Sequence, residues 1–406
     1  MTPSMTPVSI RTLDILEALV AMDTTSHRSN MACVDWIARY LQGYGIETSL
    51  IFGDTREKAN IFATIGPQDC GGIILSGHMD VVPALADGWR SDPFCMRKTD
   101  ERVYGRGTCD MKGFLAVVLA AVPEMVSRPL RCPFHLAFSF DEELGCRGVP
   151  YLIDALPTGD RRPKVALVGE PTQWQLVDRH KGSYVVSTTV RGKAAHSSRP
   201  ELGVNAISIA ARIIDRIGEL AAEMQNANVE AGLKTVFNVG KISGGSADNI
   251  VAETCTFVWG FRTFDDDAED IIARVRGYTE QMVVPRMREI SPITGVDFVV
   301  EREILALNRN EAGSGFAKML GHCVEVDGEP VYAGYGTEAG HFAKAGIPAI
   351  VCGPGDIAQA HQPDEWLAIE QLLKGDRVMT NLIAWARSHA GDELLDKDRS
   401  HENDVI

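Results

Sequence analysis

The chain has 406 residues, with hydrophobic residues at 45%, charged residues at 23% and a formal net charge of −15. This length predicts two domains with a sizeable core, and the acidic balance argues against a nucleic-acid or anionic-membrane partner, since both favour a positive surface. A small-molecule partner is expected instead. The N-terminus lacks a basic segment followed by an apolar core, and no apolar run approaches the ~20 residues that span a bilayer, which favours a cytoplasmic protein.

The first part of the chain alternates helical and strand patterns. Helical spacing of apolar residues covers Ser9–Met22, Asn30–Tyr44 and Met111–Val126. Short apolar runs with strand character cover Asn60–Ile65, Gly72–Leu75, Phe134–Phe140 and Lys164–Val168. Such alternation predicts an α/β layer with buried, partly parallel strands. The nine cysteines are scattered without a Cys-x-x-Cys pair, so we expect reduced thiols packed like small apolar residues.

The pattern changes near Gly182. Alternating strands are expected over Ser183–Arg191, Lys234–Lys241, Thr254–Phe261 and Asp297–Glu303, with helices over Val204–Met224 and Asp267–Val283. This order describes a compact α+β sandwich with helices on one face of a sheet. It reads as a domain inserted into the first one.

The first pattern resumes from about Glu311. Helices are expected over Ala312–Leu320, Ala339–Ala345 and Trp366–His389, and a strand over Ala349–Cys352. The expected domains are 1–181 and 304–390 for a discontinuous α/β domain and 182–303 for the insert. The tail, 391–406, is rich in polar residues without apolar periodicity and is expected to be disordered.

Histidines and acids recur at the ends of apolar strands or in glycine-rich loops. They are His78, Asp80, Asp110, Glu142, Glu143, Glu170 and His361. Strand carboxyl ends are where open α/β sheets bind ligands, and a pair of divalent ions held by histidine nitrogen and carboxylate oxygen suits amide hydrolysis. Any one of these acids could instead be a helix cap or a solvated loop residue, but the ordered set favours a metal site.

Six motifs carry a resemblance to a known family. They are Gly77–Asp80, Tyr104–Gly107 with Asp110–Gly113, Asp141–Glu143, Gly169–Thr172, Lys193–Ser198, and Gly353–Gly355 with His361–Asp364. As an ordered set they resemble the co-catalytic zinc amidohydrolases, the family that contains acetylornithine deacetylase, succinyl-diaminopimelate desuccinylase and the aminoacylases. The resemblance implies a mixed-sheet, three-layer α/β catalytic domain with an inserted ferredoxin-like lid and dimerisation domain.

The resemblance also implies a site with two Zn²⁺ ions per subunit, which cobalt or manganese could replace. His78 and Glu170 would bind one ion, Glu143 and His361 the other, and Asp110 would bridge both. Two neighbours of these ligands would have other roles. Asp80 would accept the second ring N–H of His78 through its carboxylate, and Glu142 would be the general base that takes a proton from the attacking water.

Further family positions concern the oxyanion and the substrate carboxylate. His196 would act across a homodimer interface to stabilise the oxyanion in the neighbouring subunit, unless it is a surface histidine that caps the next helix. Asn249 and Arg262 would bind the substrate carboxylate, although Arg262 could instead form a surface ion pair. Gly353 and Gly355 would let backbone N–H groups approach the same end of the substrate.

The substrate is inferred from the last motifs of the chain. Tyr335–Ala339 and Gln359–Glu365 resemble the acetylornithine deacetylase branch, which implies N-acetylornithine as substrate. Glu338 would face its ammonium group or be a structural acid of the loop. Desuccinylase, aminoacylase, carboxypeptidase and dipeptidase activities remain alternatives on the same scaffold. A catalytically silent, metal-stabilised dimeric binding protein is the alternative of another class.

Overall fold

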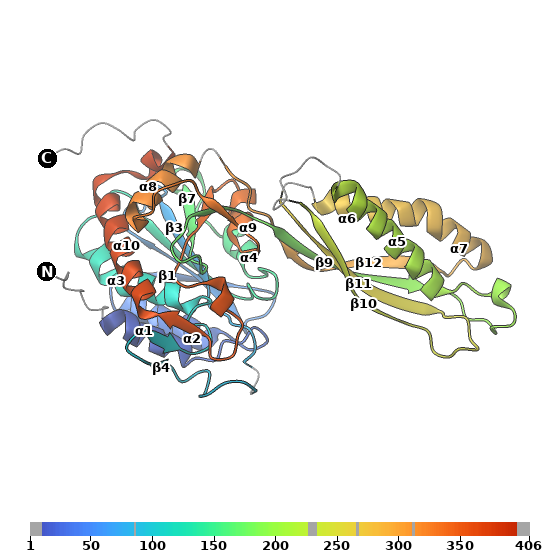
Figure 1. Ribbon diagram of the computed structural model, residues 1–406. Helices are drawn as coiled ribbons and strands as arrows, with labels where there is room; N and C mark the ends of the chain where they lie inside the picture. Colours follow the sequence, from blue (N-terminus) through green and yellow to red (C-terminus); the bar gives the residue numbers. More distant parts are fainter. Residues whose placement is uncertain (1–9, 85–86, 226–233, 265–267, 311–312, 396–406) are drawn as a thin grey trace. The chain divides into compact units, whose positions relative to one another are not determined.

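A computed structural model describes residues 10–84, 87–225, 234–264, 268–310 and 313–395 of the chain. The chain divides into two compact units (Figure 1), and each is described by itself. The larger unit is formed by Met1–His180 with Leu307–Ile406, and the inserted unit by Lys181–Ala306. The inserted unit begins one residue before the domain expected from the sequence and ends three residues after it.

An eight-stranded mixed sheet forms the centre of the larger unit, in the order β1-β2-β6-β3-β7-β14-β8-β13. β3 pairs in parallel with β6 and β7, and β7 pairs in parallel with β14, whereas β1, β2 and β6 pair antiparallel. The strands are β1 (Thr48–Phe52), β2 (Ala59–Ile65), β3 (Ile73–His78), β6 (Phe134–Ser139), β7 (Val165–Val168), β8 (Val177–His180), β13 (Val331–Ala333) and β14 (Ala349–Val351).

Helices cover both faces of this sheet, so the larger unit has the expected three layers. Residues that alternate along β3 point to opposite faces: Ile73 and Leu75 pack into one apolar cluster, and Ile74 into another. The first cluster contains α1 (Ile10–Val20), α2 (Met31–Gln42), α3 (Lys112–Ser127), α8 (Ser314–Val324) and α10 (Ile369–Ser388). The second contains α4 (Val149–Asp154) and α9 (Ala339–Lys344).

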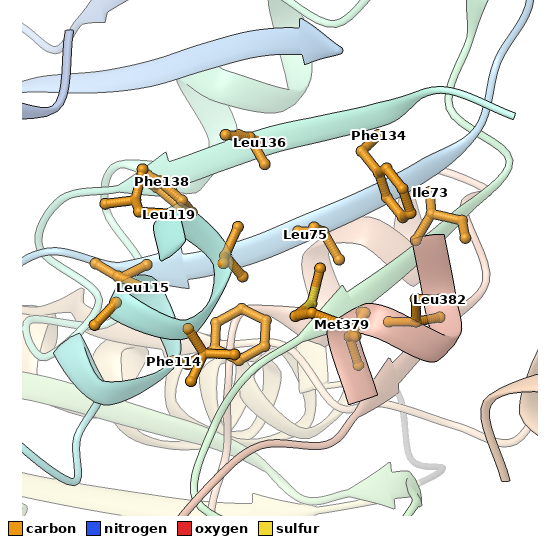
Figure 2. Packing of buried hydrophobic residues seen from close by; sticks show 14 of the residues in the cluster. Ile73, Leu75, Phe114, Leu115, Leu119, Phe134, Leu136, Phe138, Met379 and Leu382 are labelled. Carbon is orange, nitrogen blue, oxygen red and sulfur yellow. The ribbon is translucent and has the colours of Figure 1, made fainter. Parts of the chain in front are cut away.

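The first cluster is the main core. Figure 2 shows Met379 of α10 between Leu75 of β3 and Phe114 of α3, and Leu115 of α3 belongs to the same cluster. α3 is apolar along most of its length because it lies between the sheet on one side and α1 and α10 on the other. Burial of such side chains stabilises a fold by about 1.5–3 kcal/mol each. This core holds β3 and β6 rigidly, and both strands end in site residues.

A small three-stranded sheet lies in the same unit. It has the order β15-β5-β4, formed by β15 (Trp366–Ala368), β5 (Arg102–Tyr104) and β4 (Arg97–Lys98). The predicted helix Trp366–His389 is therefore wrong at its start, because Trp366–Ala368 pairs antiparallel with β5 before α10 begins. The pairing connects the segment after His361 to the segment before Asp110.

The inserted unit is a four-stranded antiparallel sheet with helices on one face. Its order is β10-β11-β9-β12, the order of a ferredoxin-like fold with the pattern strand, helix, strand, strand, helix, strand. The strands are β9 (Gly182–Arg191), β10 (Val236–Gly244), β11 (Thr254–Thr263) and β12 (Gly295–Ile304), and the helices are α5 (Ala206–Gln225), α6 (Ala268–Tyr278) and α7 (Val284–Ile290), with one π-helical turn, Thr279–Val283, between the last two.

Tyr184 and Val186 of β9 and Phe257 and Trp259 of β11 face the helices and form the core of the inserted unit. The residues between them in each strand lie on the opposite face, which none of the helices described for this unit covers (Figure 1). The inserted unit therefore has one closed and one open sheet face.

The prediction that the tail is disordered is wrong for its first five residues. Gly391–Leu395 form a 3-10 helix, and Leu394 is buried against the main core. The rest of that expectation, 396–406, lies outside the described residues.

All nine cysteines are free thiols, and seven of them are buried, as expected for small apolar residues. In the described part of the chain, no helix combines the length and apolar character needed to cross a membrane.

Candidate metal centre

Three neighbouring strands of the large sheet end at the same edge and place polar side chains there. His78 is the last residue of β3, Glu142 and Glu143 follow β6, and Glu170 follows β7. Because β3 pairs in parallel with both β6 and β7, the carboxyl ends of the three strands lie side by side. The fold thus brings four of the predicted site residues together at the edge where α/β sheets bind ligands.

Asp110 lies between the two histidines of this cluster. Its Oδ1 is 2.9 Å from Nε2 of His78, and its Oδ2 is 3.2 Å from Nε2 of His361. On the His78 side, Oε1 of Glu170 is 3.7 Å from the same ring nitrogen. On the His361 side, Oε1 of Glu143 is 3.0 Å from Nε2. One carboxylate therefore faces two histidine–glutamate pairs, with one oxygen toward each.

The donor set fits divalent metal ions. Candidate ligand atoms of His78, Asp110 and Glu143 lie within 4.8 Å of one another, and so do those of His78, Glu142 and Glu170. Imidazole nitrogen together with carboxylate oxygen is the combination that zinc and similar ions accept. Two neighbouring ions could share Asp110, because its two oxygens face different histidines.

The protonation preferences of the cluster support the same conclusion. Burial raises the pKa of Glu170 well above its usual value, and the charge of Asp110 raises it further. Burial and the charge of Asp110 also raise the pKa of Glu143. Burial alone would lower the pKa of His78, but its hydrogen bond with Asp110 raises it well above normal. So many buried carboxylates can be ionised together only if cations compensate them, as bound divalent ions would.

The chain turns sharply after β6, which separates the surroundings of two adjacent glutamates. Asp141 has a left-handed backbone conformation with φ of 53°, and its carboxylate accepts a hydrogen bond from Nζ of Lys58 at 2.6 Å. Aspartate tolerates this conformation better than most residues. Glu143 faces the exposed histidine of the cluster, whereas Glu142 is buried and its Oε1 accepts a hydrogen bond from the thiol of Cys146 at 3.5 Å. The turn therefore allows different roles for the two residues.

Asp80 differs from the prediction in how it contacts His78. Nδ1 of His78 is 2.8 Å from the main-chain oxygen of Asp80 but 3.6 Å from its carboxylate, which is beyond hydrogen-bonding distance. The carboxylate instead accepts the N–H groups of Glu142 at 3.0 Å and Glu143 at 3.3 Å, and the hydroxyl of Ser26 at 2.7 Å. The main chain of Asp80 thus orients the imidazole, and its side chain orients the loop that carries the two glutamates.

Glu365 is a buried acid to which sequence reasoning gave no role. Its Oε1 accepts the N–H groups of Cys109 at 2.9 Å and Asp110 at 3.1 Å. Its Oε2 accepts the N–H of Gly107 at 3.0 Å and Nη1 of Arg106 at 2.6 Å. Four donors therefore converge on one carboxylate and fix the loop that carries Asp110. The available signal was the position of this acid at the end of the last motif, but its partners are about 255 residues away.

Of the two roles that the sequence left open for Glu338, its surroundings favour that of a structural acid. The side chain is fully buried. Its Oε1 accepts the hydroxyl of Ser76 on β3 at 2.5 Å, and its Oε2 accepts the hydroxyl of Ser139 on β6 at 2.6 Å. Both oxygens are thus occupied within the protein, and the residue connects two strands that end in the metal centre.

The N–H groups of Gly353 and Gly355, which were predicted to approach the substrate, have acceptors within the protein. The N–H of Gly353 donates to Oγ1 of Thr172 at 3.2 Å, and the N–H of Gly355 donates to Oε1 of Gln371 at 3.3 Å, so neither is free for a substrate. Glycine is required here for close packing. A side chain at Gly353 would place Cβ 2.0 Å from the main-chain oxygen of Gly169.

His196 lies in the inserted unit and is exposed. Its Nδ1 accepts the N–H of Ser198 at 3.2 Å and contacts the hydroxyl of the same residue at 2.8 Å, so the neutral ring carries its proton on Nε2. The alternative role as a helix cap is wrong, because Oδ1 of Asn205 accepts the first N–H groups of α5. A donor on Nε2 is the form that an oxyanion requires.

Asn249 and Arg262 are both exposed in the inserted unit. The main-chain oxygen of Asn249 accepts the N–H of Ser197, which connects this loop to the one that carries His196. Within the described residues Arg262 forms no ion pair with an acid, so the alternative of a surface ion pair is not found.

Residues 74–385 match the peptidase family M20/M25/M40. An acetylornithine deacetylase from Myxococcus xanthus is 32% identical over 384 residues, which cover 91% of this chain and 96% of the relative. Two solved structures share the fold. An M20-family metallo-carboxypeptidase from Sulfolobus solfataricus has a TM-score of 0.71 at 17% identity, over 94% of this chain and all of that one. A dinuclear metal-binding M20 peptidase from Bacillus subtilis has a TM-score of 0.65 at 13% identity, over 93% and 98%.

Proposed function

Because the chain belongs to peptidase family M20/M25/M40 and is a metal-dependent hydrolase, we propose that it hydrolyses the amide bond of an N-acyl amino acid. The observation that carries the proposal is the position of Asp110, with one oxygen toward His78 and the other toward His361. A shared carboxylate between two histidine–glutamate pairs suits a two-metal centre for hydrolysis.

We assign zinc as the metal, with two ions per subunit. His78 and Glu170 would hold one ion, Glu143 and His361 would hold the other, and Asp110 would contribute to both, which is consistent with the distances among these side chains. When bound, such ions lower the pKa of a coordinated water and stabilise negative charge on the carbonyl oxygen. All other steps fall to residues of the chain.

Glu142 is the general base in this proposal. It is 7% exposed, and burial raises its pKa well above the usual value, which suits a carboxylate that must both accept and return a proton. It takes a proton from the attacking water and gives it to the nitrogen of the leaving amine. Asp80 holds its main-chain N–H and Cys146 donates to its carboxylate, so the base is held from two sides.

We assign ornithine as the amino acid and acetyl as the acyl group, because the Myxococcus xanthus relative is named an acetylornithine deacetylase and matches this chain over nearly its full length. Desuccinylase, aminoacylase, dipeptidase and carboxypeptidase activities are the alternatives. Both oxygens of Glu338 accept hydrogen bonds within the protein, so the assignment of ornithine is supported by the relatives and by the motifs of the chain rather than by this side chain.

The inserted unit supplies the remaining groups of the proposal. We assign it to a homodimer, in which His196 of one subunit donates Nε2–H to the oxyanion formed in the other. Asn249 and Arg262 bind the substrate carboxylate, which suits an exposed guanidinium that has no acidic partner in the described part of the chain.

One experiment tests the reaction and the substrate together. The wild-type chain loaded with zinc or cobalt is assayed with N-acetylornithine, N-acetylmethionine and N-succinyl-diaminopimelate, and release of free amine gives kcat/KM for each. We expect N-acetylornithine to be the best substrate. Glu142→Gln should keep two metals per subunit, measured by elemental analysis, and lose hydrolysis. If the wild type releases amine from none of the three and from no dipeptide, the proposed function is wrong and a silent metal-binding protein is favoured.

A further inference from the structure

Lys58 lies outside the metal centre but contacts two segments that hold the loop after β6. Its Nζ donates to the carboxylate of Asp141, the residue before Glu142, at 2.6 Å, and also to the main-chain oxygen of Ser26. The side chain of Lys58 is 18% exposed and that of Asp141 is 10% exposed, so this ion pair is largely shielded from water. All of these residues belong to the larger unit.

Pairing between β2 and β6 places Lys58 beside this loop. The two strands are antiparallel, and Ile61 is opposite Phe138. When this register is continued by three residues beyond Ile61 and Phe138, Lys58 comes opposite Asp141. Lys58 directly precedes β2 and Asp141 follows β6 after one intervening residue. The ion pair therefore lies at the end of the strand pair from which the chain enters the metal centre.

The second contact of Lys58 leads to Asp80. Ser26, whose main-chain oxygen accepts the hydrogen bond from Lys58, donates its hydroxyl to Oδ2 of Asp80 at 2.7 Å. The carboxylate of Asp80 in turn accepts the N–H groups of Glu142 at 3.0 Å and Glu143 at 3.3 Å. Lys58 is thus connected to the loop after β6 by two routes, one direct and one through Ser26 and Asp80.

Two negative charges meet where these routes converge. Asp80 and Asp141 are both buried, and their carboxylates repel each other. Lys58 supplies a charged hydrogen-bond donor to Asp141, and Arg147 adds a second positive charge nearby. Removal of the Lys58 amine leaves a buried carboxylate with a weaker countercharge beside another carboxylate, which is unfavourable. The turn that carries Asp141 is then expected to shift away from Asp80.

We propose that Lys58 is a positioning residue of the metal centre, which holds the loop after β6 so that Glu142 and Glu143 keep their separate orientations. The roles of these two glutamates as base and metal ligand rest on the proposed function, whereas the position of their loop does not.

The effect of Lys58 should fall on one of the two ions. Its contacts lead to Glu143, which faces His361. The loop of Asp110 is held by Glu365 instead, and Glu170 follows a different strand, β7. Loss of Lys58 should therefore weaken the ion assigned to Glu143 and His361 and leave the other ion in place.

The test counts bound zinc and does not depend on turnover. Full-length, zinc-loaded chain is dialysed against buffers of stepwise lower free zinc, and the zinc retained per subunit is measured by elemental analysis. Lys58→Met should lose one ion at a free zinc concentration about 10–100-fold higher than wild type does, and retain the other ion as wild type does. Lys58→Arg should restore part of the difference, because it keeps a charged donor for Asp141.

Kinetics at saturating zinc provide a second measurement. Displacement of Glu142 should lower kcat of Lys58→Met for N-acetylornithine by about tenfold or more, since a positioned general base contributes at least that much. KM should stay close to that of wild type, because Lys58 touches no residue assigned to substrate binding. The variant should remain folded, since the side chain of Asn30 still exchanges two hydrogen bonds with the main chain of Ala59.

Lys164→Met is the matched control. Lys164 forms an ion pair with Asp392 at 2.8 Å in the same unit, but it precedes β7 and so lies at the end of that strand away from the metal centre. This variant should change neither zinc retention nor kcat. Circular dichroism checks the fold of every variant, and if Lys58→Met is unfolded, the same comparison is made with Lys58→Gln, which keeps a neutral donor.

The proposal is overturned if the Lys58 variant retains both ions and the kcat of wild type. It is also overturned if both ions are lost together, or if Lys58→Arg is as impaired as Lys58→Met, because either result indicates a general loss of structure. If wild type binds two ions but hydrolyses no N-acyl amino acid, and the Lys58 variant still loses one ion selectively, the proposed function fails and the positioning role stands.

Discussion

Replacement of Glu365 by glutamine should loosen the metal centre without touching a ligand. The carboxylate accepts four hydrogen bonds, from the N–H groups of Gly107, Cys109 and Asp110 and from Arg106. A glutamine keeps the shape and one acceptor oxygen, but its NH₂ group must face one pair of these donors. The loop that carries Asp110 then loses half of the contacts that fix it.

The magnitude follows from the number of donors affected. Each buried donor left without an acceptor costs about 1–3 kcal/mol, so two such donors lower the free energy of unfolding by about 2–6 kcal/mol. Arg106 is 3% exposed and loses its countercharge, which places the expected loss in the upper half of that range. The displacement of Asp110 should also weaken zinc binding by roughly 10–100-fold, the usual effect of removing a group that orients a metal ligand.

The assay is competition between the folded protein and a zinc chelator at neutral pH, with thermal unfolding measured in parallel. Glu370→Gln is the control, since Glu370 is exposed in the same segment of the chain and should change neither quantity appreciably. A variant that melts earlier but binds zinc as tightly as wild type would refute the role in positioning Asp110. Unchanged melting together with unchanged zinc affinity would refute the whole argument.

Three further predictions concern other parts of the molecule. His196→Ala should keep both metals and lose most of kcat, by about 100-fold or more, and turnover near wild type in steady-state assays would exclude the oxyanion role. Burial lowers the pKa of His135 to about 4, and its Nε2 accepts the N–H of Gly72 at 3.2 Å, so the folded state holds the ring neutral. The pKa of His135 is lower in the folded state than in the unfolded state, so its contribution to the free energy of unfolding is complete above about pH 6.5 and is lost as the pH falls toward 4. At pH 5 the loss is about 2 kcal/mol. Thermal unfolding of His135→Gln should therefore depend less on pH between 7 and 5 than that of wild type, and equal slopes would count against it. Glu338→Gln should lower the melting temperature, because two buried serine hydroxyls lose a charged acceptor, yet leave the kcat/KM ratio of N-acetylornithine to N-acetylmethionine unchanged; a tenfold fall in that ratio would restore the contact with an ammonium group.

The sequence was most informative where chemistry is concentrated in short, regular segments. His78, Glu142 and Glu170 were predicted as site residues because each follows an apolar run, and in parallel strands such ends meet at one edge. Sequence was least informative about groups whose partners are distant in the chain. Glu338 looked like a possible contact for substrate, but its partners on β3 and β6 are 262 and 199 residues away.

By itself, then, the sequence determined the fold class, the inserted unit and the residue types of the metal centre, because hydrophobic periodicity and the preferred donors of a metal are local properties of the chain. Only the tertiary structure decided which polar groups form hydrogen bonds or ion pairs within the protein and which stay available to a ligand. It directs the carboxylate of Asp80 to the loop of Glu142, commits both oxygens of Glu338 to serines and, among the described residues, leaves Arg262 without an acidic partner. A hydrogen-bond donor or acceptor is available to a ligand only when no neighbour brought close by folding satisfies it first.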